Sequence, residues 1–215
     1  MKVGTDAVLL GAWVNGHAPV RILDIGTGCG LIALMLAQRY NAAQIEAIDI
    51  DEASIAEAST NFAASPWSER LKAIHAPLQH WESQAYDLIV SNPPYFSKGF
   101  PITKKNRAMA RNQETLNFET LLTHVKRLLK TDGKFALVLP ISAKPAFENE
   151  LKLAGFYCQR QTEVLSFESK NTALILLEVG FKPASVHNSA LCIRRADGAY
   201  HADYLSLTRD FYLFS

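Results

Sequence analysis

Apolar segments rich in β-branched residues alternate along the chain with segments whose apolar residues recur every three or four positions. The first pattern is typical of buried strands and the second of amphipathic helices. Their alternation predicts an α/β fold in which helices cover both faces of a mostly parallel sheet. The expected strands of the parallel part are residues 20–25, 44–50, 71–75, 86–91 and 134–139. The expected helices are residues 31–40, 52–63, 116–129 and 144–154.

The C-terminal third of the chain departs from this alternation. Residues 156–165 and 173–181 have the pattern of two consecutive strands, and the polar segment between them leaves no room for a crossover helix. One of the two should therefore be antiparallel, which gives a seven-stranded, mostly parallel sheet with one antiparallel strand. The tail, residues 189–215, is expected to add a strand and a short helix whose apolar side chains face inward: Tyr204, Leu207, Phe211 and Leu213.

Composition narrows the class of protein. The 215 residues are 48% hydrophobic and 20% charged with a formal net charge of +1, a balance that is ordinary for soluble globular proteins. No apolar run is long enough to span a bilayer, and the N-terminus lacks the pattern of a secretory signal. The three scattered cysteines, Cys29, Cys158 and Cys192, favour neither a disulfide framework nor a metal site. We expect a cytoplasmic protein that folds as one domain over residues 1–215 and uses no metal.

A glycine-rich segment, D-I-G-T-G-C-G at residues 24–30, follows the first expected strand and opens a helix. Gly26, Gly28 and Gly30 let the backbone approach a ligand closely and present N–H groups at a helix N-terminus. A nicotinamide-binding loop has the spacing G-x-G-x-x-G, whereas the third glycine here comes one residue early. Asp24 would repel a pyrophosphate but suits the cationic end of an amino-acid ligand. The segment resembles motif I of the class I methyltransferases, which implies S-adenosyl-L-methionine as the cofactor.

Further cofactor contacts are expected at the ends of the next two strands. Asp49 ends the second strand, where an acidic residue typically accepts hydrogen bonds from both ribose hydroxyls of a nucleoside. After the third strand many class I methyltransferases carry an Asp that binds the cofactor's adenine, but Pro77 stands at that place here. Adenine recognition should therefore come from backbone groups of Ala76, Pro77 and Leu78 or from the side chain of Gln79.

The fourth strand leads into the tetrapeptide Asn92-Pro93-Pro94-Tyr95. An adenine amino nitrogen is a poor nucleophile, because its lone pair is delocalised into the ring. The Asn92 side-chain oxygen and the Pro93 carbonyl can accept its N–H groups and favour the charge that develops during methyl transfer. The two prolines fix the backbone, and Tyr95 offers an aromatic face for a flipped base. Asn92 should also contact the cofactor. The alternative is a simple turn, since Asn-Pro often initiates one.

A basic segment follows this tetrapeptide. Residues 97–113 hold five basic residues and no acidic one: Lys98, Lys104, Lys105, Arg107 and Arg111. Little apolar periodicity is present, so we expect a loop beside the reaction centre that binds RNA phosphates. A solvated loop without a charge-related role is the alternative.

Several segments together resemble the bacterial tRNA1(Val) adenine-N6 methyltransferases. They are M-K-V-G-T-D-A-V-L-L-G-A-W at residues 1–13, S-P-W-S-E-R at 65–70, Q-H-W at 79–81 and F-Y-L at 211–213. The resemblance implies a Rossmann-like class I methyltransferase fold, a tRNA partner, and methylation of N6 of the adenosine beside the anticodon. It also implies that Lys2, Gly4 and Thr5 lie near the methionine end of the cofactor, although Thr5 could instead be a helix N-cap. Members of the family usually carry an extension before this segment, which we expect to be absent here.

Other functions remain as alternatives. The N-P-P-Y sequence also occurs in methyltransferases that act on rRNA or DNA adenine or on a protein glutamine. A protein-directed enzyme would not need the basic segment, and a DNA enzyme usually carries a separate target-recognition domain. A nicotinamide-dependent oxidoreductase is disfavoured by the early Gly30, and a non-catalytic binding module by the intact Asn92 to Tyr95.

Overall fold

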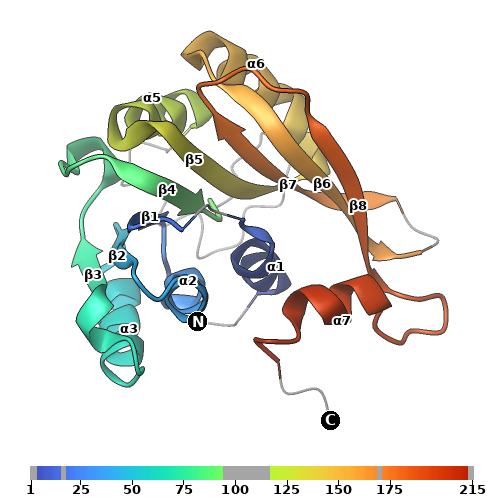
Figure 1. The fold of residues 1–215 in the computed structure, drawn as a ribbon, viewed down its shortest axis with the longest axis horizontal. Coiled ribbons are helices and arrows are strands. Elements are labelled where there is room, and N and C mark those ends of the chain that lie inside the picture. Colours follow the sequence, from blue (N-terminus) through green and yellow to red (C-terminus); the bar gives the residue numbers. More distant parts are fainter. Residues whose placement is uncertain (1–3, 16–17, 94–116, 169–170, 213–215) are drawn as a thin grey trace.

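The computed structural model describes residues 4–15, 18–93, 117–168 and 171–212 (Figure 1). Within these ranges eight strands form one sheet in the order β3-β2-β1-β4-β5-β7-β6-β8. The strands are β1 (Arg21–Ile25), β2 (Gln44–Asp49), β3 (Leu71–His75), β4 (Tyr86–Ser91), β5 (Leu129–Pro140), β6 (Tyr157–Phe167), β7 (Thr172–Gly180) and β8 (His187–Arg194). The helices are α1 (Thr5–Trp13), α2 (Leu31–Arg39), α3 (Glu52–Ala63), α5 (Phe118–Leu128), α6 (Lys144–Ala154) and α7 (Ala202–Thr208). Three short 3-10 helices complete the set: η1 (Ser68–Arg70), η2 (Leu78–His80) and η3 (Ile141–Ala143).

The sheet confirms the expected α/β fold and corrects its strand number. Strands β3, β2, β1, β4 and β5 are parallel neighbours, and β7 is antiparallel to both β5 and β6. The expectation of one antiparallel strand is therefore confirmed. The expected number of seven strands in the sheet is one too low, because the strand expected in the tail forms as β8 and joins the same sheet, parallel to β6 at its edge. β8 begins at His187, two residues before the expected start of the tail, and its first half, residues 187–190, is exposed.

Helices cover both faces of the sheet (Figure 1). One cluster of buried side chains joins α1, α2, α3 and α7 to one face, and a second joins α5 and α6 to the other. Successive strand residues alternate between them: Ile22 and Leu88 belong to the first cluster, whereas Leu23 and Ile89 belong to the second. This alternation is the period of two that a strand imposes on its side chains.

The start of β5 differs from expectation. The dipeptide Asp132-Gly133 predicts a turn after the preceding helix, with the strand beginning at Lys134. In the structure α5 ends at Leu128 and β5 begins at the next residue. The pairing with β4 then shifts from Leu129 to Lys134 within two residues of β4, so the turn residues lie in an irregular stretch of the strand itself.

The order of the strands determines where a ligand can bind. From β1 the chain moves outward through β2 to β3 and then returns to the other side of β1 as β4. In open α/β sheets ligands bind outside the carboxyl ends of the strands at such a reversal. The carboxyl ends of β1 and β4 are therefore the place to look for a site. In the part of the chain that is described, none of the helices has the length and apolar character needed to cross a bilayer.

Candidate active site

The glycine loop lies where β1 ends and α2 begins. The backbone N–H groups of Gly26 and Thr27 both donate to the carbonyl of Ile48, at 2.9 and 3.1 Å, so the loop crosses the end of β2. Gly26, Gly28 and Gly30 have φ values of 70°, 59° and 84°. This left-handed conformation is costly for residues that have a Cβ atom, which explains the three glycines.

Helix α3 packs directly against this loop. A Cβ atom placed on Gly30 would lie 2.4 Å from the Phe62 ring, so no other residue fits without displacing α3. Next to Phe62 on the same helix, the Asn61 side-chain amide donates to the carbonyl of Cys29 at 2.8 Å. Helix α3 therefore packs against one side of the loop, and the N–H groups of residues 26–28 and 30 donate to acceptors within the protein. The contacts of Asn61 and Phe62 with the loop are not signalled by any sequence motif.

Asp49 is fixed against the loop from the end of β2. Its Oδ2 atom accepts the backbone N–H of Gly28 at 2.9 Å, and its Oδ1 atom accepts that of Asp51 at 3.0 Å. The side chain is half-buried, and a carboxylate oxygen has two lone pairs, so capacity for further donors remains. This is the place at which the sequence predicts an acceptor for ribose hydroxyls.

Asp24 lies beneath the loop and is completely buried, at 0% exposure. Its Oδ2 atom accepts the Thr27 hydroxyl at 2.6 Å, whereas its Oδ1 atom has no hydrogen-bond partner among the described residues. Burial raises the pKa of Asp24 to about 7; hydrogen bonds from Thr27 and the Ala33 backbone oppose this rise, and the nearby charge of Asp49 adds to it. Because Asp24 is buried, its charged form is disfavoured and the side chain does not present an exposed acceptor to a ligand.

The first two residues of the tetrapeptide lie beside the glycine loop. Strand β4 ends at Ser91, which pairs with Ile25, and the Ser91 hydroxyl donates to the Ile25 carbonyl at 2.9 Å. Asn92 and Gly26 therefore follow directly from adjacent, paired strand ends. Asn92 is half-buried and Pro93 is buried. The remaining predicted residues of this region lie outside the described residues: Pro94, Tyr95, Lys98, Lys104, Lys105, Arg107 and Arg111.

The loop after β3 is also brought to this edge. Ala76 donates its backbone N–H to the Asp49 carbonyl at 3.0 Å, and Pro77 follows as the N-cap of η2. Sequence reasoning did not single out Ile50, which follows Asp49 and is 39% exposed despite its size. Its carbonyl contacts the His75 ring nitrogen Nε2 at 3.0 Å. An apolar side chain beside a ribose acceptor can offer a surface for a base. The feature of the sequence that could have indicated this role is an isoleucine between two aspartates.

Helix α1 begins near the same loop. Val8 shares a small apolar cluster with Leu31 and Met35 of α2, while Arg39 at the end of α2 donates to carbonyls at the end of α1. The two helices therefore run in the same direction, and both start at the glycine-loop end. Gly4 is the N-cap of α1 and makes no side-chain capping bond, so Thr5 is not the N-cap. Gly4 and Thr5 are exposed, and Lys2 lies outside the described residues.

The described ranges contain no group of three or more His, Cys, Asp or Glu side chains arranged to hold a metal ion. The predicted cofactor residues converge on one edge of the sheet. They lie at the ends of β1, β2 and β3 and in the segment that follows β4. This edge combines a glycine backbone without side chains, the Asp49 carboxylate and the Asn92 side-chain amide.

Solved structures with the same fold are methyltransferases. A predicted O-methyltransferase from Agrobacterium tumefaciens superposes with a TM-score of 0.77 over 98% of each chain at 15% identity. The glycopeptide N-methyltransferase MtfA, crystallised with S-adenosyl-L-methionine, gives 0.61 over 83% of this chain and 94% of its own at 14% identity. Residues 4–153 match the methyltransferase small domain family. Fold and sequence thus define this chain as a methyltransferase of that class.

Relatives of higher identity narrow the class to one family. A protein of Tolumonas auensis is 40% identical over 214 residues, which cover 99% of this chain and 90% of its own. One of Serratia proteamaculans is 43% identical over 220 residues, covering 100% and 84%. Both carry the name tRNA1(Val) (adenine(37)-N6)-methyltransferase. The chain belongs to this family, which confirms the resemblance stated from its motifs.

The raised pKa of Asp24 predicts a specific dependence of stability on pH. The folded protein keeps a proton on Asp24 that the unfolded chain releases above its ordinary pKa of 3.8, so this residue lowers the free energy of unfolding as pH rises from about 4 to about 7. The loss is up to about 1.4 kcal/mol per pH unit. Asp24→Asn should therefore gain stability relative to wild type on going from pH 5 to pH 8. Urea denaturation of the cofactor-free proteins tests this prediction. It would be contradicted if the free energies of unfolding of variant and wild type differed by the same amount at pH 5 and at pH 8.

Proposed function

We propose that this chain transfers the methyl group of S-adenosyl-L-methionine to N6 of an adenine in tRNA, at adenosine 37 of tRNA1(Val). The observation that carries the proposal is the pairing of Ser91 with Ile25, because Asn92 and Gly26 are the residues that follow these two strand ends. A methyl donor on the loop and an amine held by Asn92 would then share one edge of the sheet. The family to which the chain belongs supports the choice of substrate.

The described residues fit this cofactor. The left-handed glycines carry no side chain that would block a ligand, and the Asp49 carboxylate favours a cationic ligand. We propose that the cofactor is held by Asp49 at the ribose hydroxyls, by Ala76 and Pro77 at the adenine, and by the loop and the start of α1 at the methionine end. The residues at the methionine end are Lys2, Gly4, Thr5, Gly26, Gly28 and Gly30, with Asp24 buried beneath the loop. When bound, the cofactor supplies a methyl group activated by the adjacent sulfonium.

The protein's own part in the reaction is to hold the amine. In the proposed mechanism the Asn92 side-chain oxygen and the Pro93 carbonyl accept the two N–H groups of the adenine amine, which favours the charge that develops at nitrogen. Pro93 and Pro94 restrict the backbone, so these acceptors are already in position before the reaction and lose little entropy during it. Tyr95 stacks on the extruded base, a contact worth roughly 1–3 kcal/mol.

The remaining parts of the proposal concern the whole chain. The basic residues of the segment 97–113 bind tRNA phosphates beside the reaction centre. The chain acts as one methyltransferase domain, which is supported by the single sheet that its described strands form. The proposed tRNA substrate supports a cytoplasmic location for the enzyme.

Transfer of labelled methyl groups tests the function directly. The protein is incubated with labelled S-adenosyl-L-methionine and fractionated tRNA, rRNA, DNA or protein, and the product nucleosides are separated. We expect label in N6-methyladenosine from tRNA1(Val) and none when adenosine 37 is replaced by guanosine. Label in rRNA or DNA adenine, or on a protein glutamine, would overturn the proposal.

Asn92→Ala separates amine positioning from cofactor binding. Loss of one acceptor at the developing charge should lower kcat on the order of 10²- to 10³-fold. The Kd for the cofactor, measured by calorimetry, should change only a few-fold, because Asp49 and the glycine loop are unaltered. Asp49→Ala is the comparison variant and should lose cofactor affinity. If Asn92→Ala loses as much affinity as Asp49→Ala, the assigned role is wrong.

Lys104→Ala combined with Lys105→Ala tests the basic segment. Removal of two phosphate contacts should weaken tRNA binding and reduce the slope of log K against log salt by roughly one per contact. Lys152→Ala combined with Lys182→Ala is the matched control, since both residues are exposed and lie towards the opposite edge of the sheet. Filter binding at several salt concentrations measures both pairs. Equal slopes for the two double variants would remove the segment from the RNA contact surface.

A further inference from the structure

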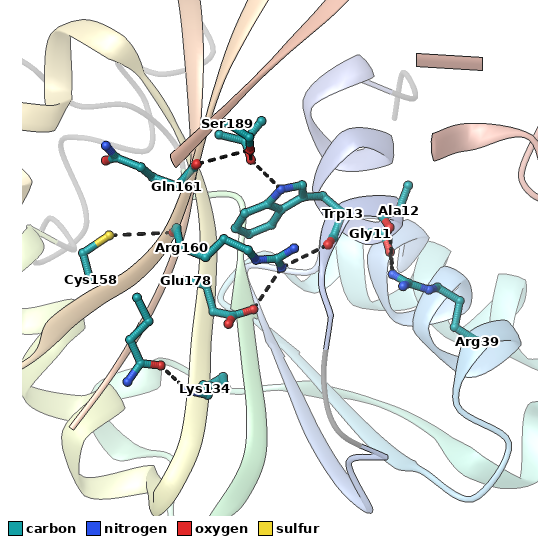
Figure 2. A network of polar contacts seen from close by, with 12 residues as sticks. Gly11, Ala12, Trp13, Arg39, Lys134, Cys158, Arg160, Gln161, Glu178 and Ser189 are labelled. Carbon is teal, nitrogen blue, oxygen red and sulfur yellow. Dashed lines mark hydrogen bonds and ion pairs between the residues drawn. The ribbon is translucent and has the colours of Figure 1, made fainter. Parts of the chain in front are cut away.

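Two arginines hold the C-terminal end of α1 (Figure 2). The Arg160 Nη2 atom donates to the Trp13 carbonyl at 3.1 Å, and the Arg39 Nη1 atom donates to the carbonyls of Gly11 and Ala12 at 2.8 and 2.9 Å. The last carbonyls of a helix have no partner within it, and they form the negative end of the helix dipole. A guanidinium group donates hydrogen bonds to these carbonyls and brings positive charge to this negative end of the helix. Arg39 comes from α2, whereas Arg160 comes from β6 in the antiparallel part of the sheet.

Arg160 also joins α1 to β7. Its guanidinium carbon lies 3.6 Å from the centroid of the Trp13 ring, and its Nη2 atom lies 3.0 Å from the Glu178 carboxylate (Figure 2). Trp13 and Glu178 are only 7% and 8% exposed, so water competes little with these contacts. The Trp13 indole N–H donates to the Thr162 hydroxyl at 2.8 Å, which adds a second connection to β6.

Helix α1 depends on such contacts for its position. It has nine residues and no side-chain cap at its N-terminus, so it is too short to be stable alone. A Cβ atom on Gly11 would lie 2.7 Å from the Met35 sulfur, which shows how closely α1 approaches α2. Close packing at Gly11 sets the distance between the two helices. The arginine contacts at the C-terminal end of α1 fix the position of α1 along the direction of α2.

We infer that Arg160 is a positioning residue for the cofactor site and acts through α1. By fixing Trp13 at the end of the helix, it sets where Gly4 and Thr5 at the beginning lie relative to the glycine loop. The helix spans about 13 Å, at about 1.5 Å per residue, so a small shift at Trp13 is carried along it to the loop. This inference rests on the proposed function, in which Gly4 and Thr5 border the methionine end of the cofactor.

Arg160→Ala tests the inference with two readouts. The Kd and KM for S-adenosyl-L-methionine should rise about tenfold, because misplaced contacts lose binding, while kcat at saturating cofactor stays within about twofold. Hydrogen exchange of the backbone amides of residues 5–13 should accelerate in the cofactor-free protein. Arg160→Lys keeps the charge beside Glu178 and should restore part of the affinity. Where Arg160→Ala alone fails to fold, Arg160→Ala combined with Glu178→Ala removes the carboxylate left without its partner and keeps the test available.

Arg21→Ala is the matched control. Arg21 also pairs with a mostly buried carboxylate, Glu46 at 2.9 Å, and lies over an aromatic ring, that of Tyr86 at 5.1 Å. Among the described residues its partners lie on β2, β4 and the segment before β4, and none lies on α1. Arg21→Ala should lower the free energy of unfolding without changing the affinity for the cofactor. Equal Kd values for Arg160→Ala and Arg21→Ala would reduce Arg160 to a structural role, whereas failure of the wild-type protein to bind the cofactor would refute the proposed function instead.

Discussion

The parallel pairing of β1 with β2 on one side and β4 on the other is the interaction from which the site follows. It places Ile25 between Ile48 and Ser91, so the residues after each strand emerge side by side. The loop that follows β1 then bends over the end of β2 because two of its N–H groups bond to the Ile48 carbonyl. Everything proposed for the cofactor and for the amine depends on this alignment, since no single segment carries the whole site.

Much of this arrangement could be predicted from the sequence. The bounds of α3, β3, β4 and α6 agree with the pattern of apolar residues. The rule that parallel strands end at one edge of a sheet is enough to bring the glycine loop and Asp49 together. Glycine spacing separates this loop from a dinucleotide loop. These features could be predicted because each of them is local: a strand, its end and the next few residues all lie in one stretch of the chain.

The rest could not be predicted, because it depends on packing between distant segments. The burial of Asp24 follows from how the loop and α2 cover it, and a carboxylate before a glycine loop gives no sign of whether it is exposed. The contact of Arg160 with Trp13 joins residues 147 positions apart and has no motif. Strand β8 agrees with the strand expected in the tail, but its pairing with β6 has no signal in the sequence. Asp24 also shows why a site and a stable core differ: a buried charge without an ion partner costs stability, and such groups are retained where they serve a ligand.

The distance along the chain between Trp13 and Arg160 has a consequence for biosynthesis. A polypeptide emerges from the ribosome N-terminus first, and domains fold as their segments become available. The glycine loop, Asp49 and Asn92 are all made before residue 100, yet Arg160 and Glu178, which fix the end of α1, belong to β6 and β7. A nascent chain that already contains every proposed cofactor contact therefore has Arg39 at the end of α1 but still lacks Arg160. On the inference that Arg160 positions the cofactor site, full affinity for the cofactor requires that β6 and β7 have left the exit tunnel.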